Sequence, residues 1–147
     1  MAKVSDLFSA GGALSKTFIG FEPRGQQVEM ACGVERALEG GNSLLVEAGT
    51  GVGKSLAYLL PAAFWAVREN KRVWVSTHTK ALQEQLLHQD LPTVQSLLKS
   101  DGLDLRFGLL MGAGNYLCLD RLQRAGTLFD GEEAQTLKSL STWAQTA

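Results

Sequence analysis

Residues 47–55, Glu-Ala-Gly-Thr-Gly-Val-Gly-Lys-Ser, combine the residue types that bind a polyphosphate. The alternate glycines let the backbone curl so that successive amides face phosphate oxygens. Lys54 could bridge β- and γ-phosphates, and the Ser55 hydroxyl is a hard oxygen ligand of the kind that Mg²⁺ prefers. The residues expected to hold ATP and Mg²⁺ are Ala48, Gly49, Thr50, Gly51, Val52, Gly53, Lys54 and Ser55.

The neighbours of this loop make it a Walker A motif. It follows an apolar run directly and opens a helical stretch, whose N-terminus adds partial positive charge where phosphate would bind. Ala48 stands where the general pattern has glycine, and this small-for-small change leaves the loop feasible. The alternative is a Gly-rich turn without a ligand.

The order of elements around the loop predicts an α/β fold. Three short apolar runs alternate with helical stretches, which is the pattern of a parallel sheet built from βαβ units with helices on both faces. The predicted strands are 43–47, 72–76 and 106–110, and the helices between them are 55–70 and 80–91, the second ended by Pro92.

The remaining segments complete one domain, as expected for 147 residues. Helical patterns cover 23–39 and 132–143. Residues 1–20 have few periodic apolar positions, so we expect a loosely ordered lead-in before a domain over 21–147.

Composition excludes several classes of protein. Hydrophobic residues make up 45% and the net charge is −1, which argues against disorder and against histone-like packing on DNA. No apolar run is long enough to cross a bilayer, and no signal peptide is evident, so we expect a cytoplasmic protein with reduced cysteines.

Four ordered segments carry a family resemblance. They are the Arg24-x-x-Gln27-x-x-Met30 pattern, the loop with its preceding run at 44–55, the polar segment 76–86 and Asn-Tyr-Leu-Cys at 115–118. Together they resemble the DinG/XPD-like branch of superfamily 2 DNA helicases, over about residues 20–143. The resemblance implies a partial RecA-like P-loop NTPase domain.

The same resemblance implies roles for residues outside the loop. It assigns Arg24 and Gln27 to the ATP site, with Gln27 reading adenine, because an amide can match the N6 and N7 edge. It assigns Thr77, Thr79 and Lys80 to the backbone of single-stranded DNA. The alternatives are an exposed helix glutamine and a hydrophilic loop.

Cys118 resembles the first of four cysteines that hold a [4Fe-4S] cluster in many family members. Cys32 lies outside that segment and is interpreted as a small core residue. The chain reads Met-Gly-Ala-Gly at 111–114, where the family usually has Lys-Gly-Arg before Asn-Tyr, so two positive charges are absent. Cys118 could instead be a buried residue of an amphipathic helix.

The sequence contains no identifiable Walker B carboxylate, water-orienting Glu or arginine finger, which ATP hydrolysis requires. We therefore expect an inactive N-terminal fragment, without Walker B and the second motor domain, of an ATP-dependent 5′-3′ DNA helicase acting in repair or replication. One alternative is a naturally short, non-catalytic module that binds nucleotide or single-stranded DNA. Another is a small P-loop kinase or GTPase, although neither Asn-Lys-x-Asp nor an arginine-rich lid is present.

Overall fold

The computed structural model describes residues 4–18, 20–125 and 130–145. The chain divides into two compact units, residues 1–108 and residues 109–147. The first unit carries the phosphate loop.

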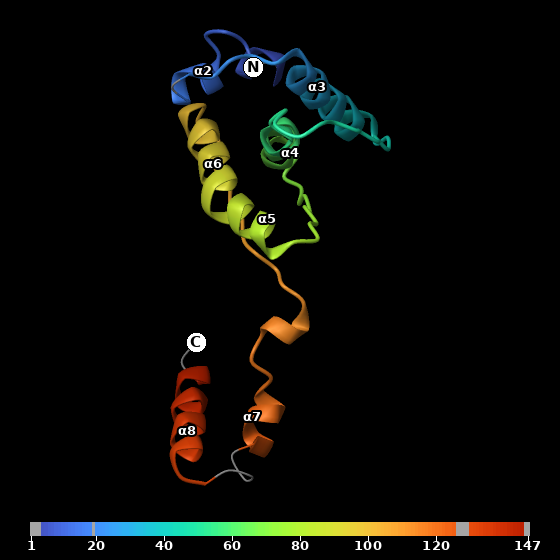
Figure 1. Cartoon of the computed structure of the whole chain (residues 1–147). Helices are drawn as coiled ribbons and strands as arrows, with labels where there is room; N and C mark the ends of the chain where they lie inside the picture. Colours follow the sequence, from blue (N-terminus) through green and yellow to red (C-terminus); the bar gives the residue numbers. More distant parts are fainter. Residues whose placement is uncertain (1–3, 19, 126–129, 146–147) are drawn as a thin grey trace. The chain divides into compact units, whose positions relative to one another are not determined.

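Two helices form the centre of the first unit. Helix α3, Gly25–Gly40, packs along α4, Lys54–Arg68 (Figure 1). Helix α3 ends at Gly41, whose left-handed backbone closes the helix without the steric cost that a Cβ would bring. Both helices lie within two residues of the predicted bounds, and the apolar face of α4 supplies much of the core: Ala57, Leu59, Leu60, Ala63 and Phe64.

The N-terminal segment contributes to the same core. It forms α1, Val4–Leu7, and α2, Ala13–Thr17, where a loosely ordered lead-in was expected. The side chains of Phe8 and Leu14 are fully buried, and α1 contacts α3 while α2 contacts α6. Residues 1–3 and 19 of the expected lead-in lie outside the described residues.

A long helical segment follows the second apolar run. It comprises α5, Lys80–Gln85, the π-helix η1, Leu86–Asp90, and α6, Leu91–Ser100. The prediction that the helix ends at Pro92 is wrong. The Leu91 amide donates to the Leu86 carbonyl five residues back, and this wider turn lies just before Pro92, which has no amide proton to give.

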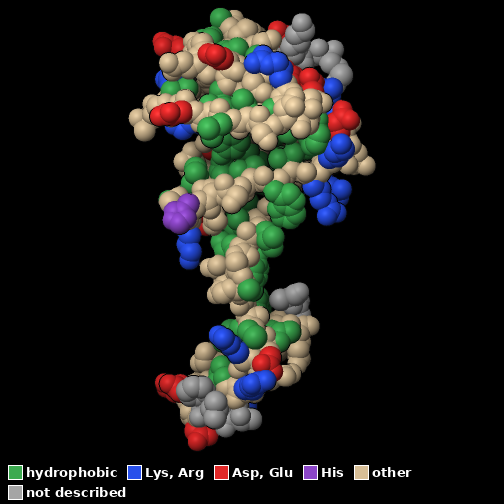
Figure 2. Space-filling model, turned by 90° about the vertical axis from the view of Figure 1, so that its right-hand side faces the viewer, with side chains coloured by type: hydrophobic (Ala, Val, Ile, Leu, Met, Phe, Trp, Pro, Cys, Tyr) green, Lys and Arg blue, Asp and Glu red, His purple; other side chains and the backbone are tan. Residues whose placement is uncertain are grey.

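The predicted α/β sheet is absent, and this prediction is wrong. Throughout 4–18, 20–125 and 130–145 the regular elements are helical, and the three apolar runs have no strand pairing. The side chains of these runs are largely exposed, and the exposed fraction is 97% for Leu45 and 75% for Trp74. Figure 2 shows hydrophobic side chains at the surface. The core is instead closed by helices, so the β-type composition of the runs is not matched by sheet hydrogen bonds.

The second unit is a small helical assembly. It contains a 3₁₀ turn, Ala113–Asn115, then α7, Leu119–Ala125, and α8, Glu132–Ala144, which contact each other. Helix α8 agrees with its predicted bounds within one residue. Among the described residues of both units, every helix is too short or too polar to span a bilayer.

We predict that Leu14→Ala lowers the free energy of unfolding by about 3 kcal/mol, because it leaves a cavity in the core. Leu45→Ala is the matched control: the same atoms are removed from an exposed side chain, so a change below about 0.5 kcal/mol is expected. Urea denaturation followed by circular dichroism measures both. Equal stability of wild type and Leu14→Ala would show that residues 4–17 are not part of the fold.

Candidate functional site

The phosphate loop leads directly into α4. Gly51 and Gly53 have φ of 78° and 82°, in the left-handed region that favours glycine. Gly53 is the residue before the helix, and its carbonyl accepts from the Ala57 amide at 3.2 Å, the first hydrogen bond of α4. The free amides at this helix start therefore face the loop, which is the arrangement that binds anions.

The Lys54 ammonium lies against its own loop. Its Nζ donates to the carbonyl oxygens of Ala48 at 3.0 Å and Gly49 at 2.5 Å. These are neutral acceptors, whereas phosphate oxygens are charged and make stronger hydrogen bonds to an ammonium. Lys54 can therefore exchange the two carbonyls for a bound phosphate.

Two side chains from the start of α3 reach the same loop. The Arg24 guanidinium donates to the Gly51 carbonyl, and the Gln27 Nε2 donates to the Gly53 carbonyl at 3.0 Å. Gln27 is only 4% exposed, whereas Arg24 is exposed. A Cβ on Gly53 would collide with the Gln27 amide, so Gln27 and Gly53 are in close contact.

Ser55 has a partner that the sequence analysis did not identify. Its hydroxyl interacts with the phenol of Tyr58, one turn later on α4. Burial raises the pKa of the Tyr58 phenol, the Ser55 hydrogen bond lowers it, and the charge of Asp90 raises it, with a net rise. The spacing of three residues on a helix was the available signal, because such side chains share a face.

The predicted DNA-binding residues lie at the start of α5. Thr79 caps this helix, and its Oγ1 accepts from the Leu82 amide at 3.3 Å, which leaves the hydroxyl proton free to donate elsewhere. Lys80 is exposed, and Thr77 is half-buried. The structure therefore gathers two exposed donors, from Thr79 and Lys80, at one helix end.

Cys118 is an exposed free thiol in the second unit, and Cys32 lies on α3 in the first. A [4Fe-4S] cluster needs four thiolates, so these two cysteines cannot supply its ligands. Among the described residues, no group of three or more His, Cys, Asp or Glu side chains could hold a metal ion.

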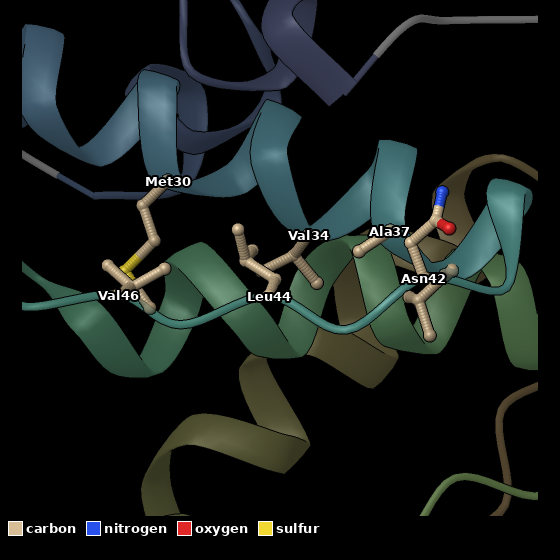
Figure 3. A pocket seen from close by; sticks show the side chains of 7 residues that line it. Met30, Val34, Ala37, Asn42, Leu44 and Val46 are labelled. Atoms are coloured by element: carbon tan, nitrogen blue, oxygen red, sulfur yellow. The ribbon is translucent and has the colours of Figure 1, made fainter.

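An apolar pocket of about 320 Å³ lies next to the loop's preceding run. Figure 3 shows Leu44 and Val46 directed from this run toward α3. Without a charged side chain, the pocket offers nothing that would recognise phosphate. Its lining residues are Met30, Val34, Ala37, Leu38, Asn42, Leu44 and Val46.

The comparison with protein families decides the interpretation of this loop. Residues 31–116 match the family described as DEAD/DEAH box helicase, which is more than half of the chain. The chain belongs to the DEAD/DEAH box helicases. Membership in this helicase family favours the helicase interpretation over a small P-loop kinase or GTPase. The match includes the phosphate loop and the start of α5, whereas Arg24, Gln27 and Cys118 lie outside it.

Individual proteins similar to this chain are also named as helicases. The ATP-dependent DNA helicase YoaA of Escherichia coli is 49% identical over 121 residues, 82% of this chain and 18% of the relative. YoaA of Haemophilus influenzae is 40% identical over 144 residues, 96% of this chain and 21% of the relative. The ATP-dependent helicase DinG of Mycobacterium tuberculosis is 46% identical over 122 residues, again 82% and 18%. The chain thus spans about a fifth of these relatives' length.

We predict that Gly53→Ala lowers the free energy of unfolding by about 2 kcal/mol, because alanine is strained at this φ and its Cβ meets the Gln27 amide. Gly108→Ala is the control, since its Cβ would enter open space. In a Gln27→Ala background the cost of Gly53→Ala should fall, because the collision is relieved. Urea denaturation of all four variants measures these differences, and an unstrained Gly53→Ala would contradict the loop geometry.

Proposed function

We propose that this chain is the nucleotide-binding part of an ATP-dependent DNA helicase of the DinG type. The observation that supports this most directly is the loop at the start of α4, where Lys54 and the free amides can converge on a polyphosphate. The likeness to YoaA and DinG helicases supports ATP as the nucleotide. We further propose 5′-3′ polarity and a cytoplasmic role in DNA repair or replication.

Each residue of the loop has a distinct proposed role. The Lys54 ammonium would leave the Ala48 and Gly49 carbonyls and donate to the β- and γ-phosphates instead. Ser55 would hold Mg²⁺ through its hydroxyl oxygen, next to the Tyr58 phenol. Bound Mg²⁺ would neutralise phosphate charge. Thr50 and Val52 belong to the same loop, and Gln27 would read adenine through the polar atoms that its bond to Gly53 does not use.

The start of α5 is proposed to bind single-stranded DNA. Thr77 and Thr79 would donate hydroxyl protons to phosphate oxygens, and Lys80 would supply a positive charge. These are backbone contacts, so no base preference is expected from them. Cys118 is proposed as one possible cluster ligand only if a longer chain supplies three more thiolates.

We predict that Lys54→Ala weakens binding of MgATP by about 10- to 100-fold, because charge-assisted hydrogen bonds to the phosphates are lost. Isothermal titration calorimetry measures the affinity. Lys16→Ala, which removes an exposed lysine on α2, should bind like wild type. Unchanged affinity of Lys54→Ala would refute the nucleotide site. We also expect this chain to bind ATP without hydrolysing it or unwinding DNA.

We predict that Lys80→Ala lowers the slope of log affinity against log salt by about 0.7 for a single-stranded oligonucleotide, since one phosphate contact is lost. Fluorescence anisotropy with labelled oligo-dT at several salt concentrations gives this slope. Lys99→Ala removes an exposed lysine at the other end of the segment, on α6, and should leave it unchanged. Equal slopes for both variants would contradict a DNA contact at the start of α5.

A further inference from the structure

The side chains of Arg24 and Gln27 donate hydrogen bonds to two alternate carbonyls of the phosphate loop. Arg24 is the residue immediately before α3, with an extended backbone, and Gln27 lies in the first turn of that helix, three residues later. Their side chains donate to the carbonyls of Gly51 and Gly53, respectively. Both carbonyls belong to glycines with positive φ.

A carbonyl held in this way fixes the amide that shares its peptide plane. A trans peptide is planar, and its C=O and N–H point in opposite directions. The described residues contain no cis peptide bond. The Val52 amide therefore points away from the Arg24 guanidinium, and the Lys54 amide points away from the Gln27 side chain.

We propose that Arg24 and Gln27 are positioning residues of the phosphate loop, which direct the Val52 and Lys54 amides, respectively, at a bound polyphosphate. The inference rests on the proposed nucleotide site and adds a function to it. Positioning acts through the loop backbone, so this part of the effect on affinity is independent of the nucleobase. It adds to base reading by Gln27, which affects adenine nucleotides alone.

The contacts of Arg24 and Gln27 can persist when a phosphate binds, whereas those of Lys54 cannot. Lys54 must release the Ala48 and Gly49 carbonyls to reach a phosphate, whereas Arg24 and Gln27 need not move. Gln27 is held in place by burial, and its target carbonyl is also fixed by the Ala57 amide at 3.2 Å. The loop therefore keeps its shape at Gly51 and Gly53 while Lys54 changes partners.

Methionine substitutions test the proposal, because methionine is unbranched and long but has no N–H donor. Arg24→Met and Gln27→Met each remove one contact. Arg121→Met is the control for charge: it removes an exposed arginine from α7, in the second unit, and no hydrogen bond or ion pair of Arg121 occurs in the described structure. Arg24 is exposed, so Arg24→Met tests the proposal even if Gln27→Met fails to fold.

The affinities of MgATP, MgGTP and inorganic tripolyphosphate are measured by calorimetry. We expect Arg24→Met to weaken all three by the same factor, about three- to tenfold, as for loss of one hydrogen bond. Gln27→Met should also weaken all three, with a larger loss for MgATP, because Gln27 is also proposed to read adenine. Arg121→Met should match wild type. Weaker binding of MgATP alone would overturn the proposal in favour of base reading, and unchanged binding of all three would also overturn it.

Amide chemical shifts locate the effect on the loop. When tripolyphosphate is titrated into labelled wild type, the Val52 and Lys54 amides should shift strongly. Arg24→Met should reduce the shift at Val52, and Gln27→Met should reduce the shift at Lys54. Reductions spread equally over the whole loop in both variants would contradict this assignment. If wild type binds none of the three ligands, the proposed nucleotide site itself fails, which is a distinct result.

Discussion

The left-handed conformation of Gly53 is the constraint on which the site depends. It turns the chain from the phosphate loop into α4. Its carbonyl accepts from the Ala57 amide, in the first hydrogen bond of that helix, and from the Gln27 side chain. A Cβ at this position would displace the Gln27 amide from the Gly53 carbonyl. Helices α3 and α4 pack against each other. At the end where both helices meet the loop, the Gln27 hydrogen bond to Gly53 adds a polar contact.

Helices were predictable in this chain, and the sheet was not. Periodic apolar residues located α3, α4 and α8 because a helix forms all its backbone hydrogen bonds within one segment. A strand depends on partners elsewhere in the chain, which composition does not specify. Val73, Trp74 and Val75 have strand-type side chains, yet in this structure they lie in an irregular segment beside helices that already enclose the core.

The site was predictable to the extent that it is local in sequence. The glycines, Lys54 and Ser55 lie next to one another, so their spacing alone indicates a phosphate loop before a helix. Arg24 contacts Gly51, 27 positions later in the sequence, and Gln27 contacts Gly53, 26 positions later. Such contacts become known only once the packing of α3 is seen. A family pattern in the sequence indicated that Gln27 belongs to the site. It did not indicate that Gln27 contacts the Gly53 carbonyl. Tyr58 was overlooked because its partner is known only once α4 is seen as a helix.

The π-helix before Pro92 also bears on which face α6 turns toward the core. A hydrogen bond that reaches back five residues accommodates one more residue than a regular turn, and each residue of an α-helix advances the side chains by about 100°. Val94, Leu97 and Leu98, which follow this wider turn, are buried in the core. A natural sequence shorter by one residue in η1 would turn that apolar face by more than a quarter of a rotation. Length within η1 is therefore as much a determinant of the core as the identity of the residues that fill it.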